Sequence, residues 1–440
     1  MVTLRRVFRR LESVRVGVIG DFIYDTYTTG KVGRISPEAP VPVLHVIREE
    51  GRPGGAGNVV LNLVSLGAQV FAIGRIGPDI AGSSLKHLLS TEGVDVSGII
   101  VQQAYQTPVK NRLIADAQQV LRVDFEQVES IPESVEQEVI KLLPHLLEQI
   151  DILAISDYAK GFLSPSLLSA VIEMAQEREI PVIVDPKGDD FSLYHGATVL
   201  KPNLQEAYAA AKLSKATPLE QVAEALFKKA HVEMLMITRS EAGISLFTRS
   251  GSRFDFPVQS KEVTDVTGAG DTVLAVLVFA LGNGLEVQEA TELANMAAGI
   301  AIERLGCARI DLSDLATRLL ESDVENKVFH EDHLFALQQA LKGKDYTVLG
   351  ISGKDGMTTP LFRSIRKLSQ KDTKLILYVK EPSVDEEFVP LLSSLADVDF
   401  VILQCESLKH LCETIHPSEV FVMEGESLVS LGDFKVLLGG

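Results

Sequence analysis

Short apolar runs rich in β-branched residues alternate with segments of helical periodicity over most of the chain. The apolar runs, each predicted to be a strand, cover 15–19, 70–76, 152–155, 182–184, 198–200 and 234–237. The helix-like segments between them include 58–66, 134–149, 165–178 and 219–230. Strands that alternate with helices form parallel sheets covered on both faces. The pattern therefore predicts an α/β fold on a central, mostly parallel sheet.

Two regions break this alternation and indicate a small lid. Residues 41–47 and 107–125 alternate polar and apolar positions, which is typical of antiparallel strands with one polar face. We expect them to form a flap over the edge of the sheet at which α/β proteins bind ligands.

The α/β pattern closes near residue 319, and a second unit follows it. Residues 321–327 are polar and are predicted to form a linker. Four more strand-like runs, at 346–351, 375–379, 400–403 and 420–423, predict a smaller, Rossmann-like α/β domain of roughly 110 residues. We therefore expect one domain over residues 1–320 and another over residues 328–440.

Charge and cysteine content exclude several classes of protein. The net charge of -18 argues against non-specific binding to nucleic acid. Cys307, Cys405 and Cys412 fit no zinc or disulfide spacing, so a reduced, cytoplasmic setting is expected. The most apolar run, 273–281, is too short to span a bilayer, and no membrane partner is expected.

A Gly-Ala-Gly turn at residues 268–270 opens onto a continuously apolar helix. Unpaired backbone N–H groups at such a helix start favour an anion such as phosphate. Asp271 would repel a phosphate there, so it is better explained as a base that faces a substrate hydroxyl. The alternative is an ordinary helix start capped by Thr267 or Asp265. The chain has neither a P-loop nor the third glycine of a dinucleotide fingerprint.

Two further polar turns suit a sugar. Glycines at 54, 55 and 57 precede Asn58 and an apolar helix, and glycine lets the backbone approach a ligand closely. Asn58 can both donate to and accept from sugar hydroxyls. Asp21 and Asp25 follow the first strand and can recognise pairs of hydroxyls. The alternatives are a simple turn before a helix and a solvated turn.

Asn203 and Glu206 begin a helix that follows the strand at 198–200. They lie three residues apart and therefore share one face of that helix. An amide and a carboxylate can hold hydrated magnesium beside nucleotide phosphates. A helix N-cap with a capping-box acid fits the same spacing equally well.

The order and joint presence of these turns resemble a known family. Residues 54–58 and 265–271 resemble the two signatures of the ribokinase-like (PfkB) sugar kinases, and 203–206 resembles their Asn-x-x-Glu motif. The resemblance covers residues from about 12 to 320. Further segments are similar to the heptose 7-phosphate kinase domain of the bifunctional HldE proteins, namely 33–43, 118–126, 156–161, 238–243 and 294–299.

The resemblance implies ATP-dependent phosphorylation of D-glycero-β-D-manno-heptose 7-phosphate at O1, a step toward ADP-heptose for the lipopolysaccharide core. Asp271 would be the catalytic base, and Mg²⁺ would lie near Asn203 and Glu206 through water. The implied ATP and anion-hole residues are Asn203, Glu206, Thr238, Gly243, Thr267, Gly268, Ala269, Gly270 and Asn295. The implied substrate residues are Asp21, Asp25, Gly54, Gly55 and Asn58, with Lys110, Arg112 and Lys160 as candidates for the sugar's own phosphate. A homodimer paired through the lid is also implied.

In the HldE proteins a cytidylyltransferase-like domain with a His-x-Gly-His motif follows the kinase and transfers AMP to heptose 1-phosphate. Here His330 and His333 occupy the corresponding place, but Asp332 replaces the glycine and Glu331 adds a second carboxylate. Carboxylates there would repel nucleotide phosphates. We therefore expect a degenerate second site, in a domain kept for dimerisation, folding support or regulation.

Three alternatives stay open at this point. The kinase could act on another sugar or sugar phosphate, or the second domain could still adenylylate heptose 1-phosphate. The chain could also be a non-catalytic protein that binds sugars or nucleotides, although Asp271 and both glycine turns count against that.

Overall fold

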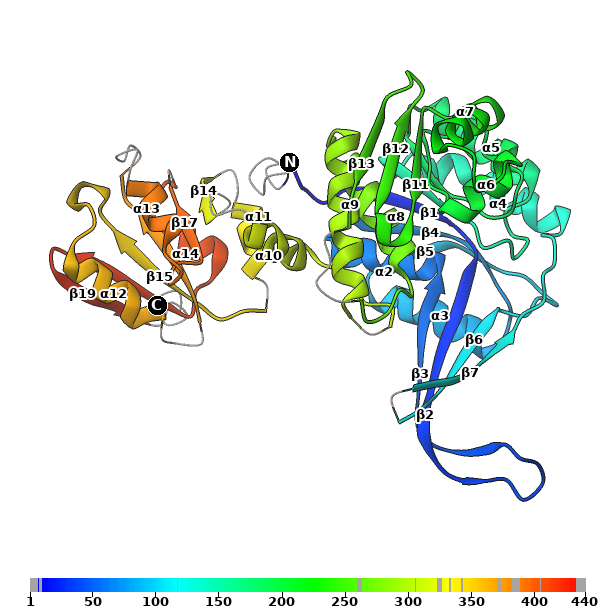
Figure 1. Ribbon diagram of the computed structural model, residues 1–440, viewed down its shortest axis with the longest axis horizontal. Helices are drawn as coiled ribbons and strands as arrows, with labels where there is room; N and C mark the ends of the chain where they lie inside the picture. Colours follow the sequence, from blue (N-terminus) through cyan, green and yellow to red (C-terminus); the bar gives the residue numbers. More distant parts are fainter. Residues whose placement is uncertain are drawn as a thin grey trace. The chain divides into compact units, whose positions relative to one another are not determined.

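The computed structural model describes residues 7, 10–116, 118–258, 263–304, 306–322, 327–331, 334–341, 343–369, 373–381, 388–403 and 405–432. The chain divides into two compact units (Figure 1). One consists of Ser13–Ile310, and the other consists of Met1–Glu12 together with Asp311–Gly440. None of the described helices is long and apolar enough to cross a membrane.

A nine-stranded sheet forms the centre of the first unit. Seven neighbouring strands run parallel, and two more add an antiparallel hairpin at one edge. This is the mostly parallel sheet that the sequence predicts. In order across the sheet, the strands are β13 (Arg253–Phe256), β12 (Ile244–Thr248), β11 (Met234–Thr238), β10 (Val199–Leu200), β9 (Val182–Asp185), β8 (Ile152–Ser156), β1 (Arg15–Gly20), β4 (Gln69–Ile76) and β5 (Asp95–Val101).

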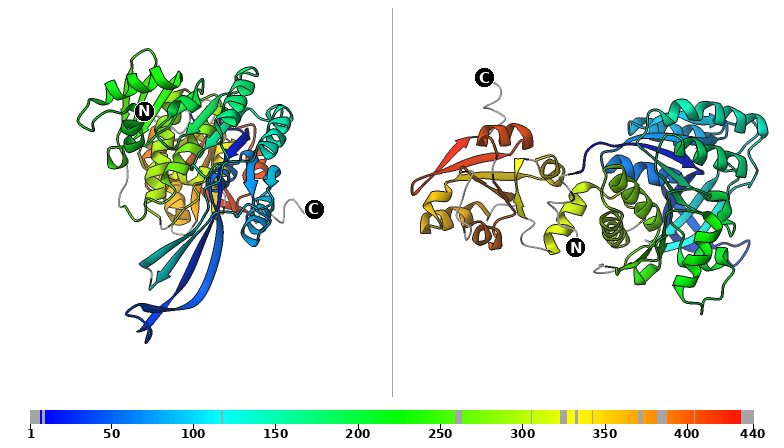
Figure 2. Two further views of the ribbon diagram at one scale, coloured as in Figure 1. Left: turned by 90° about the vertical axis from the view of Figure 1, so that its right-hand side faces the viewer. Right: turned by 90° about the horizontal axis from the view of Figure 1, so that it is seen from above.

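Helices cover both faces of this sheet (Figures 1 and 2). The first face carries α2 (Ala56–Ser65), α8 (Ala269–Gly282) and α9 (Val287–Ile302), with α3 (Ile80–Thr91) beside β5. The second face carries α4 (Glu133–Leu147), α5 (Pro165–Gln176), α6 (Leu204–Ala211), α7 (Leu219–Ala230) and the short helix η1 (Phe191–Tyr194). Helix α8 packs against α2, α9 and the central strands, so it is buried on nearly every side. That burial explains its continuously apolar sequence.

The lid is a separate four-stranded sheet. Its strands, in order, are β3 (Pro42–Gly55), β2 (Phe22–Ile35), β6 (Val109–Ala115) and β7 (Gln118–Phe125). Only Asp21 separates β1 from β2, so the chain passes directly from the central sheet into the lid. Both segments predicted as a flap lie in this sheet, whereas β2 was not expected. Figure 2 shows the β2–β3 ribbon extending well beyond the helices.

The second unit has its own six-stranded sheet, which is parallel except for one antiparallel strand at an edge. Its strands, in order, are β14 (Val328–Phe329), β17 (Phe400–Ile402), β16 (Lys374–Val379), β15 (Tyr346–Ile351), β18 (Glu419–Glu424) and β19 (Ser427–Gly432). The helices of this unit are α10 (Leu312–Ser322), α11 (Leu334–Leu341), α12 (Thr359–Ser369), α13 (Phe388–Ser394) and α14 (Leu408–Ile415). A core of aliphatic side chains from β15, β16, β17 and α12 lies between sheet and helices.

The two units divide before α10, at Ile310, whereas the sequence places the boundary after residue 320. Helix α10 packs against α11 and groups with the second unit. The expected linker begins within α10, and its residues 323–326 lie outside the described ranges.

Candidate active site

The glycine turn at the start of α8 leaves the helix end open to a ligand. Gly268 is the N-cap residue, with φ of 77°, and no side chain caps the helix. A Cβ at Gly268 would lie 2.9 Å from the Asn58 amide nitrogen, so only glycine fits there. The alternative of a cap by Thr267 or Asp265 is wrong. Asp265 instead accepts hydrogen bonds from the backbone of Thr267 (2.9 Å) and of Gly306 (3.0 Å), which holds the turn in place.

Asp271 lies in the first turn of α8 and is 7% exposed. The Asn58 Nδ2 group donates to its Oδ2 at 2.7 Å, and the Tyr158 hydroxyl donates to its Oδ1 at 2.5 Å. Burial raises the pKa of the Asp271 carboxyl, while these two hydrogen bonds oppose the shift. A carboxylate fixed in this way and raised in pKa is suited to accept a proton from a bound hydroxyl.

A cavity of about 200 Å³ opens beside Asp271. It lies at the carboxyl ends of the central strands, where α/β sheets bind ligands. Its lining includes five carboxylate- or amide-bearing residues and two lysines, and its floor contains the open turn of α8. The lining residues are Asp157, Tyr158, Asp185, Pro186, Lys187, Lys201, Asn203, Glu206, Thr238, Gly268, Gly270 and Asp271.

Lys201 is a residue that the sequence reasoning did not assign. Its side chain is only 3% exposed, and its Nζ lies 2.9 Å from Asp185 Oδ2. A Cβ at Gly270 would lie 3.9 Å from the same nitrogen, so this cation lies next to the open helix end. A buried ammonium beside a helix start that no side chain caps favours an anion.

Asn203 and Glu206 form the capping box that was the alternative to a magnesium site. The Asn203 side chain accepts from the Glu206 backbone at 2.9 Å, and Glu206 Oε2 accepts from the Asn203 backbone at 3.0 Å. Glu206 Oε1 also accepts from Lys187 Nζ at 2.6 Å. Both residues line the cavity, and the Asn203 amide oxygen and both Glu206 carboxylate oxygens accept hydrogen bonds from the chain.

Two carboxylates of this cavity should give the protein an unusual pH dependence of stability. Burial raises the pKa of Asp157 and of Asp185 to about 6. The unfolded chain releases these protons near pH 4, so the folded state holds more protons between about pH 4 and 6. The free energy of unfolding should therefore fall as the pH rises through that window, by at most about 3 kcal/mol per carboxylate.

Urea unfolding at intervals across this window would measure the slope. Asp157→Asn should flatten this slope, because the amide cannot titrate. Its oxygen can still accept from the Ala159 N–H, which Asp157 now binds at 2.7 Å. A free energy of unfolding that rises from pH 4 to 6 would contradict the prediction.

Asp21 positions a loop of the site. Its Oδ2 accepts from the backbone N–H groups of Tyr158 and Lys160, both at 3.0 Å. These bonds hold the segment that carries the Tyr158 hydroxyl to Asp271. Asp21 is 3% exposed, and burial raises its pKa. The structure thus gives Asp21 backbone partners, in addition to any hydroxyl of a ligand.

A second cavity, of about 410 Å³, lies on the side of Asn58 that faces the lid. Asp25 and Asn58 are among its polar lining residues, and the others that line it are Tyr27, Gly51, Arg52, Pro53, Leu61, Leu88, Glu92, Cys307, Ala308 and Arg309. A Cβ at Gly54 would lie 2.1 Å from Asp25 Oδ2, and Gly55 has φ of 57°. The glycines therefore let the end of β3 pass directly against the carboxylate.

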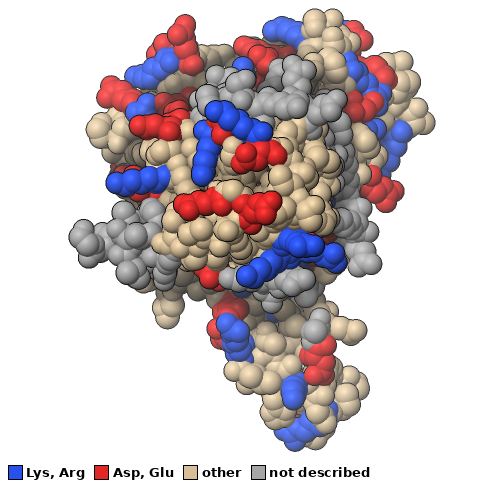
Figure 3. All heavy atoms as spheres, turned by 90° about the vertical axis from the view of Figure 1, so that its left-hand side faces the viewer, with Lys and Arg blue, Asp and Glu red and all other residues tan. Residues whose placement is uncertain are grey.

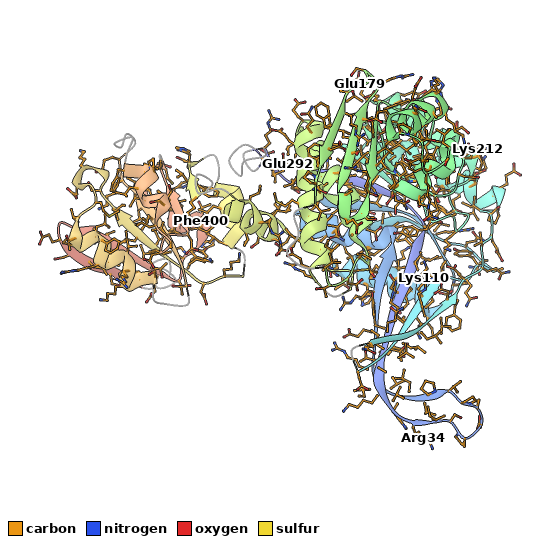
Figure 4. All side chains as sticks on the ribbon, viewed as in Figure 1. Arg34, Lys110, Glu179, Lys212, Glu292 and Phe400 are labelled. Carbon is orange, nitrogen blue, oxygen red and sulfur yellow. The ribbon has the colours of Figure 1, made fainter. Side chains whose placement is uncertain are left out.

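The three cations assigned to the substrate's phosphate differ in their surroundings. Arg112 pairs with Asp25 at 2.7 Å, and Lys160 pairs with Glu126 at 2.9 Å. Lys110 lies 6.0 Å from the centre of the Tyr158 ring, where the lid joins the rest of the unit (Figure 4). Burial lowers the pKa of Lys110, which a bound anion would oppose.

The remaining predicted nucleotide residues are not all brought together. Thr238 lines the cavity at the end of β11, and its backbone forms an isolated parallel β-bridge with Asn203. Gly243 has φ of 81° in a turn, and a Cβ there would meet the Phe256 carbonyl at 1.9 Å. Asn295, on α9, donates to the Pro257 carbonyl at 2.8 Å. Both residues thus support the segment around β13 and do not line the described cavity.

The candidate second site has a different position in its sheet. His330 follows β14, a two-residue strand at the sheet edge. The strand order reverses between β15 and β18, and ligands of open α/β sheets bind at such a point. Three strands, β17, β16 and β15, separate β14 from that point. His333 lies outside the described residues.

Comparison with known proteins places this chain in a family. The central sheet, helices and lid are similar to phosphofructokinase-2 from Escherichia coli (TM-score 0.59, 20% identity, 70% of this chain and 99% of that one). They are also similar to Arabidopsis thaliana ribokinase in complex with ribose and ATP (TM-score 0.55, 18% identity, 70% and 99%). Residues 15–315 match the pfkB family carbohydrate kinases, and the chain belongs to that family.

The full-length relatives narrow the family further. The chain is 38% identical over 439 residues to the bifunctional protein HldE of Geobacter metallireducens, across 96% of this chain and 89% of that protein. It is 38% identical over 442 residues to HldE of Geotalea uraniireducens, across 96% and 90%. Within the PfkB carbohydrate kinases, the chain therefore belongs with the HldE proteins, as its sequence motifs predict.

Proposed function

We propose that the first unit transfers the γ-phosphoryl group of ATP to O1 of D-glycero-β-D-manno-heptose 7-phosphate, giving the 1,7-bisphosphate. Asp271 removes the proton of the anomeric hydroxyl as its oxygen attacks the phosphorus. The proton ends on the Asp271 carboxylate, and ADP leaves with the charge of the broken bond.

The observation that carries this proposal is the place of the Asp271–Asn58 pair. Asp271 lines the smaller cavity, which has the open helix end and Lys201. Asn58 lines the larger cavity on the lid side and donates to Asp271 at 2.7 Å. A base that stands between an anion cavity and a polar cavity can link a phosphoryl donor to a hydroxyl acceptor.

The smaller cavity suits the nucleotide phosphates. Backbone N–H groups of Gly268 and Gly270 and the Lys201 ammonium would stabilise charge on the transferring group. The Ala269 N–H already donates to the Val266 carbonyl at 3.3 Å. Its oxygen donors, from Asp185, Asn203 and Glu206, are the ligand types that Mg²⁺ accepts, mostly through water. When bound, the ion would neutralise charge on the phosphates.

The larger cavity suits the sugar. Asn58 and Asp25 offer an amide and a carboxylate to its hydroxyls. For the phosphate of the substrate we favour Lys110, because Arg112 and Lys160 already pair with carboxylates at 2.7 and 2.9 Å. Arg112 would then orient Asp25.

We further propose that the second unit does not transfer AMP. Two observations support this. His330 follows an edge strand that lies away from the point where the strand order reverses, and the next residue, Glu331, places a carboxylate beside His330 that would repel nucleotide phosphates. The relatives carry the name bifunctional, so this proposal separates the chain from them.

A panel of acceptors tests both proposals. The full-length protein, ATP and Mg²⁺ are assayed for ADP release with heptose 7-phosphate, free heptose, fructose 6-phosphate and ribose. Heptose 7-phosphate should give the highest kcat/KM. Heptose 1-phosphate with ATP should give no ADP-heptose, and its formation would overturn the reading of the second unit. Turnover of another sugar alone would show that the proposed substrate is wrong. No turnover with any acceptor would indicate a non-catalytic protein that binds sugars or nucleotides.

The lid supports the proposal of a homodimer. Large apolar side chains on its strands are more than half exposed, among them Val46, Ile47, Leu121 and Phe125. Figure 3 shows the lid projecting with an uncharged surface between its charged side chains. A second copy of the lid would cover these side chains and pair its exposed strand edges.

Substitution of Ile47 tests this assembly. Ile47 is 68% exposed on β3, and Ile47→Asp should convert the dimer into a monomer in light scattering coupled to size exclusion. Ile80→Asp is the matched control, since Ile80 is 86% exposed on α3 and outside the lid. A wild-type protein that is monomeric at micromolar concentration, or a dimer that Ile47→Asp leaves intact, would contradict the proposal.

A further inference from the structure

We propose that the second unit binds a divalent transition-metal ion, with Zn²⁺ as the probe, between Glu331, Glu406 and His410. This site is independent of the kinase centre, because all three residues belong to the second unit. It also lies beside the place where a nucleotide-binding histidine pair was expected.

The topology of the sheet brings the three residues together. Strands β14 and β17 are parallel neighbours, so their carboxyl ends lie at the same edge of the sheet. Glu331 follows the end of β14 at Phe329, and Glu406 follows the end of β17 at Ile402. His410 lies in the first turn of α14, which begins after the same loop as Glu406.

The side chains converge within the span of one coordination sphere. One ligand atom from each of the three residues lies within 4.8 Å of the others. Glu331 Oε2 accepts from the Glu406 backbone N–H at 3.0 Å, and Glu331 Oε1 lies 3.6 Å from His410 Nε2. The Ser407 hydroxyl caps α14 by accepting from the His410 backbone at 3.0 Å. Backbone contacts thus hold two of the three residues in place.

The donor set favours a transition metal. Two carboxylates at this spacing repel each other unless a cation lies between them. An ion pair of protonated His410 with Glu331 would neutralise one carboxylate and leave the other. Two carboxylates and one imidazole can bind zinc as three protein ligands with an open fourth position. The imidazole nitrogen disfavours Mg²⁺ and Ca²⁺, which prefer oxygen ligands.

A metal ion at this place would join two separate segments of the second unit. Strand β14 has two residues and pairs with β17 at the edge of the sheet. An ion shared by Glu331 and His410 would tie the residue after β14 to the start of α14. Because binding to the folded state alone stabilises that state, the ion should raise the unfolding temperature of the second unit.

Isothermal titration of the chelator-treated, full-length protein with Zn²⁺ tests the proposal. One equivalent should bind to the wild type. His410→Ala and Glu331→Gln should each weaken binding by more than the roughly 10–100-fold that loss of an outer-shell partner costs. His416→Asn is the matched control, since His416 is exposed at the end of the same helix with φ of 54°, which asparagine tolerates.

Cobalt substitution supplies a second measurement. Co²⁺ should give visible d–d absorption bands with the wild type and with His416→Asn, and none with His410→Ala. Unaltered circular dichroism and ADP release would show that the variants are folded. Zinc affinity that is unchanged in both ligand variants would overturn the proposal. Loss of zinc binding on substitution of His195 and His231, two histidines of the first unit whose rings lie 4.8 Å apart, would also overturn it.

Discussion

Asp271→Asn should lower kcat of the kinase reaction by about 100- to 10,000-fold, the contribution of a positioned general base. The amide keeps the size of the carboxyl and can still accept from the Tyr158 hydroxyl. It cannot take the proton of the attacking hydroxyl. Because burial raises the pKa of Asp271, removing its charge should not destabilise the fold.

The measurement is steady-state ADP release together with the pH dependence of kcat/KM. In the wild type, kcat/KM should fall on the acid side as Asp271 gains a proton, at a pH above the usual range of an aspartate. Asp271→Asn should abolish that acid limb along with most of the rate. Asp189→Asn is the control, since Asp189 is exposed on the loop after β9. Near wild-type turnover in Asp271→Asn would refute the assignment of the base.

The central fold could be predicted because its strands are buried on both faces. Strands such as β8, with every residue buried, read as continuous apolar runs between helices of clear periodicity. Strands β5, β12 and β13 were not predicted; β5 and β13 lie at the sheet edges and are partly exposed, whereas β12 is mostly buried. Strand β2 was also missed, because the acids that precede and begin it read as a turn.

The catalytic turns could be found in the sequence, but their neighbours could not. The Gly268–Asp271 turn is a local signal, since its conformation depends on adjacent residues. The pair of Lys201 with Asp185 is not local. It forms because β9 and β10 are parallel neighbours, so that their carboxyl ends meet. The available signal was that Lys201 directly follows a predicted strand, but this position indicated no function until the strand order was known.

The substrate residues take part in ion pairs that depend on contacts between distant segments of the chain. Arg112 and Lys160 have the charge that a phosphate requires, but each pairs with a carboxylate of the chain. Their sequence positions do not reveal this, because Asp25 and Glu126 come from other strands and loops. The same holds for His330, whose place at a sheet edge follows from the order of strands that come later in the chain.

Lys201→Met should reduce both the stability and the activity of the protein. Removal of the ammonium leaves the Asp185 carboxylate, whose side chain is 21% exposed, without its partner. The loss when the carboxylate is ionised should be at most about 3–5 kcal/mol, the value for a fully buried pair. Asp185 can relieve this cost by taking up a proton, since burial raises its pKa to about 6. Urea unfolding should therefore show a larger loss of stability at pH 8 than at pH 5.

The double variant Lys201→Met/Asp185→Asn separates the two roles of the lysine. The neutral pair leaves no buried charge, so most of the free energy of unfolding lost at pH 8 should return. Activity should not return, because the cation beside the open end of α8 is still missing and phosphate charge is less stabilised. The reference for activity is Asp185→Asn alone, because Asp185 is also a candidate Mg²⁺ ligand. If kcat/KM for ATP in the double variant equals that of Asp185→Asn, Lys201 serves only to hold Asp185. If it stays below that of Asp185→Asn while stability recovers, the ammonium acts on the transferring phosphoryl group.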